Sequence, residues 1–424
     1  MPEILNKLNK EISEKEENKN FNKLISKEFF DRIGFGFGSQ QFINILFSQI
    51  GASLFLIGLI NGLRVVIGNI SYFCIQKFKG IKLTRNVISW SGIIFGFSFL
   101  LMAIAIFVES ILFFIIAIVI SSISIVIYGE SKGLFLLRSS KAYLIERFMK
   151  YSLIITVISL FVSAIIMDKY QISGTRVAWN IFNNLISIKI HGYLIVFEIA
   201  AIAFILAGYI LLQVKTNRIV KKVPIGSNFG YFVKNKVLLL LTITNIIIGL
   251  VQTIGFSYYG IFIYRYFNNV LFGGFLNVAM VFLISVFTSL IGLFLTKLNA
   301  RVYRKFSIFI FGVMMVGFMP FTYFFNPNLS LITIGTIIGV IGSSAVGVTN
   351  SLLVIGLVNH NMRQSYFSFI NLASVPFFLI MAPALAYIAQ TFGLNLLFLL
   401  LTIIMLILMV VLIIASIVLR KELI

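Results

Sequence analysis

The stretch GLNLLFLLLTIIMLILMVVLIIASIVL occupies residues 393–419 and contains no charged side chain. About 20 consecutive apolar residues in a helix cross the roughly 30 Å hydrocarbon core of a bilayer, so this stretch predicts a membrane-spanning helix. The whole chain has the same character, because 60% of its 424 residues are hydrophobic, only 11% are charged, and its mean hydropathy is +1.05. This composition is typical of an integral membrane protein.

Similar apolar runs recur toward the N-terminus. The predicted spans are 33–52, 54–76, 86–108, 111–137, 151–167, 192–213, 237–264, 271–296, 306–325, 329–358, 366–390 and 393–419. These runs are continuous, unlike the alternating segments of about 10 residues that build a membrane β-barrel. We therefore expect an all-α integral membrane protein with twelve transmembrane helices in two six-helix halves around a central cavity.

The spans divide the chain into two halves with polar ends and a polar linker. The expected segments are a cytoplasmic N-terminal tail at 1–32, a first half at 33–213, a cytoplasmic linker at 214–236, a second half at 237–419 and a cytoplasmic C-terminus at 420–424. The halves look like a repeat, since Gly58-Leu-Ile-Asn61 in the second span matches Gly274-Phe-Leu-Asn277 in the eighth. Duplicated halves are a frequent transporter plan, and chance similarity among Ile- and Phe-rich helices is the alternative.

The positive charge of the chain is distributed unevenly. The net charge is +21, yet residues 1–32 hold seven basic and seven acidic side chains and contribute none of it. We place 21 of the remaining 27 basic residues in the ends or loops that share one side of the membrane with the C-terminus. This positive-inside pattern predicts a multi-pass protein of the cell membrane with both termini cytoplasmic. A nucleic-acid partner is not expected, because no polar domain carries a basic face.

Three stretches resemble a known family. LFSQIGASLFLIGLINGL from Leu46 is similar to the junction of helices 1 and 2 of the major facilitator superfamily, GYLIVFEIAAIAFILAGYILL from Gly192 to its helix 6, and RQSYFSFINLASVPFFLIMAPALAYIAQTFGLNLLF from Arg363 to its helices 11 and 12. The resemblance covers about residues 30–420 and does not assign a subfamily. It implies transport, with helices 3, 6, 9 and 12 outside and the others around a central cavity.

The chain departs from that family at its signature loop. An acid is expected within YFCIQKFKGIKLTR from Tyr72, where Gln76 stands, and within GLFLTKLNARVYRK from Gly292, where Thr296 stands. Both losses put the usual charge latch between loop and helix in doubt.

Polar side chains lie on one face of eight predicted helices, including Asn277 in the eighth. Because polar groups in lipid are costly unless they face other helices or water, we predict that such faces line the cavity. The residues predicted to bind solute are Gln41, Asn44, Arg64, Tyr128, Lys132, Asn245, Gln252, Tyr259 and Asn350. For most Ser and Thr residues a hydrogen bond between helices is the simpler interpretation.

Charged side chains within the spans are few. Arg64 lies near the middle of the second span, where an arginine costs roughly 2.5–3.5 kcal/mol on insertion scales. Glu130 and Lys132 lie two residues apart, so only one of them shares the face of Tyr128, and we expect that one to be Lys132. Glu130 then has two interpretations, a buried pair with Arg64 or the group that couples transport to protons.

Several other chemistries find no support in the sequence. The chain has one cysteine, Cys74, and two histidines, so we expect neither a disulfide nor a metal centre. No phosphate-binding Gly-x-x-x-x-Gly-Lys-Ser/Thr run occurs in the sequence. We therefore expect no cofactor and do not expect an enzyme. The segment 175–191 carries Val177, Ile181 and Ile188 at helical spacing. It predicts a short helix on the outer surface, or part of a gate.

These observations favour a secondary active transporter that moves a small solute, anionic or amphipathic, by alternating access. Its expected partners are the solute and the lipid bilayer, and it is expected to be monomeric. The alternatives are a lipid or oligosaccharide flippase and a transporter-like sensor or scaffold that no longer transports.

The topology can be tested with single cysteines in a Cys74→Ser background. Because the basic loops are expected inside, cysteines at Gly51 and Asn326 should react with an impermeant thiol reagent added outside intact cells, and cysteines at Lys82 and Lys222 should not. The reversed labelling pattern would overturn the orientation.

Overall fold

The computed structural model describes residues 2–77, 83–129, 152–170, 174–181, 184–214, 229–294, 302–325, 328–359 and 362–419. The chain forms two compact units. Unit 1 consists of Met1–Ser39 and Lys79–Lys221, and unit 2 consists of Gln40–Phe78 and Lys222–Ile424.

Helices account for every predicted span. Among the described residues, nine helices are long and apolar enough to cross a bilayer. The other three predicted spans fall on α1 (Pro2–Phe37) with α2 (Gln40–Gln49), on α8 (Leu153–Lys169) and on α12 (Gly274–Phe294). The prediction of a helical integral membrane fold is confirmed, with one β-hairpin outside the spans. Residues 130–137, 151 and 295–296 of the predicted spans lie outside the described residues.

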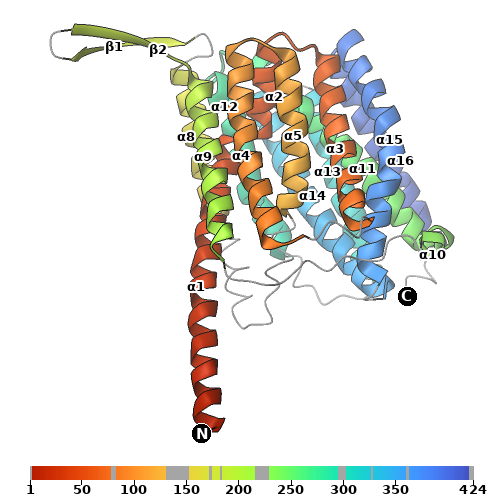
Figure 1. Cartoon of the computed structure of the whole chain (residues 1–424). Coiled ribbons are helices and arrows are strands. Elements are labelled where there is room, and N and C mark those ends of the chain that lie inside the picture. Colours follow the sequence, from red (N-terminus) through yellow and green to blue (C-terminus); the bar gives the residue numbers. More distant parts are fainter. Residues whose placement is uncertain are drawn as a thin grey trace. The chain divides into compact units, whose positions relative to one another are not determined.

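Unit 1 contains five described helices. They are α1, α4 (Arg85–Phe107), α5 (Ile111–Gly129), α8 and α9 (Gly192–Leu212). Helix α4 packs against α5 and α9, and α1 packs against α8 and α9 (Figure 1). Helix α1 is continuous across the boundary predicted at residue 32 and runs beyond the end of α9, where the Lys23 ammonium donates to the Gln213 carbonyl at 2.6 Å.

Small residues allow the helices of unit 1 to approach closely. A Cβ atom at Gly96 of α4 would lie 2.8 Å from the Ala201 carbonyl oxygen of α9, and one at Gly208 of α9 would lie 2.8 Å from the Ser89 carbonyl oxygen of α4. Membrane helices often use small residues in this way, because van der Waals packing replaces the hydrophobic effect in lipid.

The other side of α4 is apolar and exposed. The exposed residues, spaced three or four apart, are Trp90, Ile94, Phe97, Leu101 and Ile104. This stripe agrees with the expectation that the third span faces lipid.

The segment 175–191 is a β-hairpin, so the predicted surface helix is wrong. Strands β1 (Thr175–Ile181) and β2 (Asn184–Ile190) pair antiparallel, with Thr175 opposite Ile190 and Ile181 opposite Asn184. The physical reason is the run of β-branched and aromatic residues at every second position, Thr175, Val177 and Trp179 in β1. Such alternation favours a strand over the competing helical spacing.

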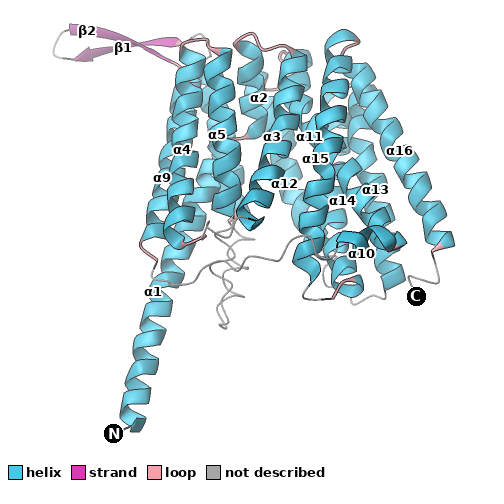
Figure 2. Ribbon diagram, turned by 45° about the vertical axis from the view of Figure 1, so that its right-hand side comes forward, coloured by secondary structure: helices cyan, strands magenta, loops and turns pink. Residues whose placement is uncertain are grey.

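Unit 2 contains nine described helices. They are α2, α3 (Leu54–Lys77), α10 (Phe229–Lys234), α11 (Lys236–Tyr266), α12, α13 (Val302–Phe325), α14 (Leu329–Leu357), α15 (Arg363–Thr391) and α16 (Leu394–Val418). Helix α11 contacts all of the others, α13 packs against α14 and α16, and α3 packs against α15. Both strands drawn in Figure 2 belong to unit 1, and the described part of unit 2 consists of helices and their connections.

Residues 40–78 come from the first half of the sequence but pack with the second. Helix α3 meets α15 through small residues, because a Cβ atom at Gly62 would collide with the Ala382 side chain and one at Gly58 would lie 2.7 Å from the Ala386 Cβ. Helix α2 packs against α11. Helices α2 and α3 are therefore in close contact with helices that follow them by about 200 residues or more in the sequence.

The last residues of the predicted linker form a short helix, α10. Helix α10 inserts Phe232 into a cluster with Leu238, Val354, Val358 and Tyr366, all of which are buried. The Asn235 side chain then accepts a hydrogen bond from the Leu238 backbone N–H and caps the start of α11. Residues 215–228 lie outside the described part of the chain.

Candidate solute site

A chain of amide side chains joins α2, α3 and α11. Gln40 donates to Asn61 at 3.1 Å, Asn61 donates to Asn44 at 3.0 Å, and Asn44 donates to the Phe256 carbonyl at 3.3 Å. Gln41 accepts a hydrogen bond from the Gly260 backbone N–H at 3.0 Å. Two of the predicted solute ligands, Gln41 and Asn44, are thus buried in the contact between α2 and α11.

A second set of amide contacts joins α11 to α14. Asn245 donates to Asn350 at 3.1 Å and to the Leu241 carbonyl at 2.6 Å. About two turns further along α11, Gln252 donates to the Ser343 hydroxyl at 2.8 Å. Three more predicted ligands, Asn245, Gln252 and Asn350, are brought to one interface, where their side chains also hold the helices together.

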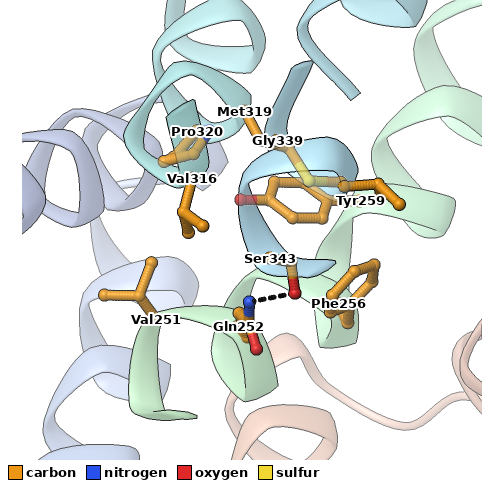
Figure 3. A pocket seen from close by; sticks show the side chains of 10 residues that line it. Val251, Gln252, Phe256, Tyr259, Val316, Met319, Pro320, Gly339 and Ser343 are labelled. Atoms are coloured by element: carbon orange, nitrogen blue, oxygen red, sulfur yellow. Dashed lines mark hydrogen bonds between the residues drawn. The ribbon is translucent and has the colours of Figure 1, made fainter. Parts of the chain in front are cut away.

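Tyr259 lies among aromatic rings. Its ring centroid is 4.2 Å from that of Tyr323 and 5.3 Å from that of Phe398. The same ring borders a small cavity, which Gln252 and Ser343 also line (Figure 3). The cavity volume is about 10 Å³, which is enough for about one water molecule and too small for an organic solute.

Arg64 is the cation within the second span. It is half-buried on α3 and makes no hydrogen bond or ion pair with a described residue. Residues 40–78 and 222–424 contain a single acidic residue, Glu422, which lies outside the described residues. No described acid of unit 2 therefore neutralises the charge of Arg64.

Two of the predicted site residues, Glu130 and Lys132, lie outside the described residues. The pairing of Glu130 with Arg64, one of the two interpretations of Glu130, lies outside them as well. Their roles stay predictions.

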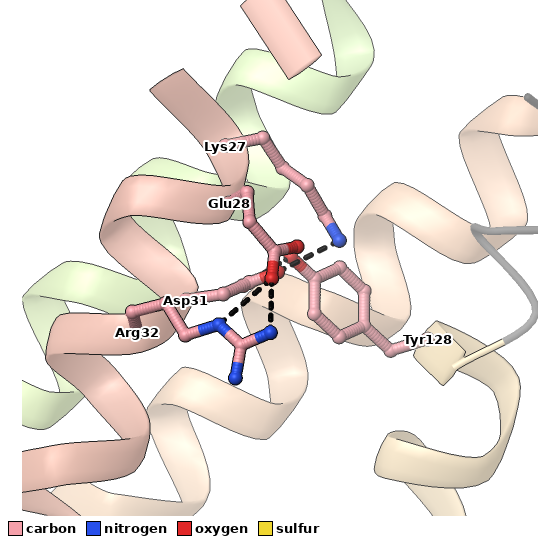
Figure 4. Close-up of polar contacts among 5 residues, drawn as sticks. All are labelled: Lys27, Glu28, Asp31, Arg32 and Tyr128. Atoms are coloured by element: carbon pink, nitrogen blue, oxygen red, sulfur yellow. Dashed lines mark hydrogen bonds and ion pairs between the residues drawn. The ribbon is translucent and has the colours of Figure 1, made fainter. Parts of the chain in front are cut away.

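Unit 1 contains a buried ionic cluster around Tyr128, which sequence analysis assigned to the cavity. The Tyr128 hydroxyl donates to the Asp31 carboxylate at 2.7 Å, and the Lys27 ammonium lies 2.7 Å from the other Asp31 oxygen (Figure 4). Glu28 and Arg32 form a second ion pair one residue along the same helix, at 2.7 Å. The cluster ties α1 to α5.

Asp31 is the acid of this cluster that could exchange a proton while shielded from water. Only 4% of its surface is exposed. Burial raises the pKa of the Asp31 carboxyl, and the neighbouring Lys27 ammonium and the Tyr128 hydroxyl lower it. Glu28 adds a smaller upward effect on the pKa of Asp31.

This cluster was not expected from the sequence, because residues 1–32 carry no net charge and have the composition of a polar tail. The available signal was spacing, since Lys27 with Asp31 and Glu28 with Arg32 are both four apart on a helix.

Comparisons with solved structures identify the fold of the chain. No protein-family model and no curated protein matches the sequence. Among the solved structures that match, a mutant of the nucleoside transporter NupG has a TM-score of 0.69 and 13% identity, and the match covers 93% of this chain and 99% of that one. A bacterial homologue of the iron transporter ferroportin in an inward-facing state has a TM-score of 0.68 and 12% identity, over 94% of this chain and 98% of that one. A proton-dependent oligopeptide transporter has a TM-score of 0.67 and 12% identity, over 96% of this chain and 100% of that one. The chain has the fold of major facilitator superfamily transporters.

Proposed function

We propose that this protein is a secondary transporter that moves a small solute across the cell membrane by alternating access between two six-helix halves. The support is the fold, which it shares with transporters of nucleosides and oligopeptides and with a homologue of an iron transporter. At 12–13% identity these likenesses extend to architecture only, and the residues of this chain support the mechanism and the class of solute.

The observation that carries the proposal is the packing of residues 40–78 with α11 and α15. If the halves are 33–213 and 237–419, every contact of α2 and α3 with these helices joins one half to the other. Three such contacts lie near the loop that connects α2 and α3: Arg265 donates to Ser48, Tyr258 donates to the Leu54 carbonyl, and the Phe55 N–H donates to Gln390. These contacts form a gate that is closed at the loop end, which is the outer end in the expected topology.

The gate has the physical properties of a reversible contact. Its three hydrogen bonds are accepted by a neutral hydroxyl, a backbone carbonyl and a side-chain amide, and small residues of α3 such as Gly58 and Gly62 pack against alanines. Hydrogen bonds between membrane helices are each worth only about 1 kcal/mol, so the set can separate when solute binding favours another conformation. The ferroportin homologue that the chain resembles is likewise described in an inward-facing state.

A cross-link across the gate should stop transport. In a Cys74→Ser background, the pair Gln41→Cys and Gly260→Cys is suitable because a Cβ at residue 260 would lie 3.2 Å from the Gln41 Cβ, close to disulfide geometry. Oxidation should lower solute uptake into proteoliposomes by about tenfold or more, since the outer gate can no longer open, and a thiol reductant should restore it.

The matched control is a cross-link within the second half. The pair Gly317→Cys and Met405→Cys joins α13 to α16, because a Cβ at residue 317 would lie 3.1 Å from the Met405 Cβ. Oxidation of this pair should leave most uptake intact. Full transport by the oxidised 41–260 pair would refute the gate, and no uptake of any solute by the Cys74→Ser protein would favour the sensor or scaffold alternative.

The charge balance of the spans favours an anionic solute. Arg64 lies in unit 2, which has no acid among its described residues, and Lys132 adds a second cation to the predicted site. Positive potential in a low-dielectric cleft concentrates anions and repels cations. A carboxylate is the simplest partner, because it can accept a bidentate pair of hydrogen bonds from an arginine.

Neutral substitutions test this preference. Arg64→Gln and Lys132→Gln should each reduce uptake of organic anions by about tenfold or more, because the attractive potential is lost. Ser121→Ala serves as the control, because it removes a buried hydroxyl of α5 without changing charge. Equal uptake of organic cations and anions by the unmodified protein would contradict the preference.

The coupling ion is the remaining part of the mechanism. Glu130 is the acid predicted from the sequence, and Asp31 is a second candidate, because its carboxyl is buried and its pKa is raised by that burial. If protons drive the cycle, substitution of the coupling acid should abolish accumulation against a gradient but preserve counterflow exchange, which moves no net proton.

Glu130→Gln and Asp31→Asn should therefore give opposite results in proteoliposomes with an imposed pH gradient, one losing accumulation and the other keeping it. Thermal unfolding in detergent identifies variants that are merely unstable. If both variants accumulate solute like the unmodified protein, neither acid couples transport to protons, and the uniporter or exchanger interpretation replaces proton coupling.

A further inference from the structure

The connection between α11 and α12 is built around one buried side chain. Asn277, in the first turn of α12, is only 1% exposed. Its amide nitrogen donates to the Phe267 and Val270 carbonyls at 2.7 and 2.6 Å, and its amide oxygen accepts from the Phe272 N–H at 3.3 Å. Asn277 was predicted to contribute to a cavity face, and the structure uses it to shape this loop.

Further hydrogen bonds complete the loop from its own residues. The Asn268 side chain accepts from the Gly274 N–H at 2.9 Å. The Val270 N–H donates to the Phe267 carbonyl, and the Gly273 N–H donates to the Val270 carbonyl. The N–H groups of Val270, Phe272 and Gly273 and the carbonyl of Val270 are thus bonded within the protein and do not require water.

The tip of this loop is apolar and exposed. Leu271 is 75% exposed and Phe272 is 63% exposed, with Val270 exposed beside them. Leu271 has φ = 54°, a left-handed conformation that glycine or asparagine normally occupies. A leucine held in that conformation with its side chain exposed indicates that the side chain has a use outside the fold.

We propose that Val270, Leu271 and Phe272 form an anchor that inserts into the boundary between headgroups and acyl chains of a phospholipid bilayer. The loop connects two helices of the membrane-embedded part of the chain, so its tip lies at the end of that part. Residues 266–274 contain no charged side chain, and the exposed ring of Tyr266 at the end of α11 is of the type enriched at membrane interfaces.

A lipid partner fits these features better than a protein partner. Recognition of a specific protein commonly uses polar or charged groups around an apolar centre, whereas the side chains of Asn268 and Asn277 bond within this loop. A lipid interface favours the burial of apolar area, and the exposed side chains of Val270, Leu271 and Phe272 supply it. The inference rests on the membrane fold and not on the transport proposed above.

Single tryptophans measure the depth of the tip. The chain contains two tryptophans, Trp90 and Trp179, which can be replaced with phenylalanine. Phe272→Trp or Leu271→Trp is then introduced and the protein is placed in nanodiscs of phosphatidylcholine with or without bromine atoms on the acyl chains. We expect blue-shifted emission, quenching by the brominated lipid of about twofold or more, and weak quenching by iodide.

The control is Lys19→Trp in the same background. Lys19 is exposed on the part of α1 that precedes Lys23, so its tryptophan should be quenched by iodide and not by brominated lipid. Iodide quenching of the Phe272→Trp variant equal to that of the control would place the tip in water and overturn the proposal. Protection from both quenchers would overturn it too, since protein must then cover the tip. Two variants guard against misfolding of either one.

Discussion

Polar groups in a bilayer need partners, and this single constraint accounts for most of the specific structure described above. Amide side chains of α2, α3, α11 and α14 bond to one another, to hydroxyls and to backbone groups, as in the contact from Gln40 through Asn61 and Asn44 to Phe256. Because lipid offers no hydrogen bonds, each such pair selects one helix neighbour among many apolar faces that would otherwise be equivalent. Apolar packing holds the helices together, and the amides determine their register.

The same constraint explains which parts of the fold could be predicted. Span positions follow from the length of apolar runs, and the helices appear where the hydropathy placed them, as α16 does for residues 393–419. The β-hairpin at Thr175–Ile190 was missed because Val177, Ile181 and Ile188 fit helical spacing and strand alternation almost equally. Outside the bilayer the hydrophobic period is no longer enforced by lipid, so the β-branched residues decided the outcome.

For the candidate site, the sequence supplies residues and faces but not their role, and the role of these residues as solute ligands stays a prediction. Helical phase placed Asn245 and Gln252 on one face of α11, and in the structure both side chains contact α14. It cannot distinguish a side chain that binds solute from one that binds a neighbouring helix, and Gln41 and Asn44 make contacts of the second kind in this conformation. Asp31 was missed for a different reason, since a buried ion pair within a charged segment changes neither net charge nor hydropathy.

The uneven placement of acidic residues has a consequence for regulation. Histidines titrate near neutral pH, and carboxyl groups do so when burial or a neighbouring negative charge raises their pKa. Unit 2 holds one of each, Glu422 and His360, whereas unit 1 holds the other twelve acids and His191. Acid–base chemistry is therefore concentrated in one of the two units, and the other presents a nearly constant positive charge at any pH in which cells live. A change of acidity near neutral pH would therefore alter the charge of unit 1 more readily than that of unit 2, because unit 1 holds nearly all the groups that burial or a neighbouring charge can bring into that range.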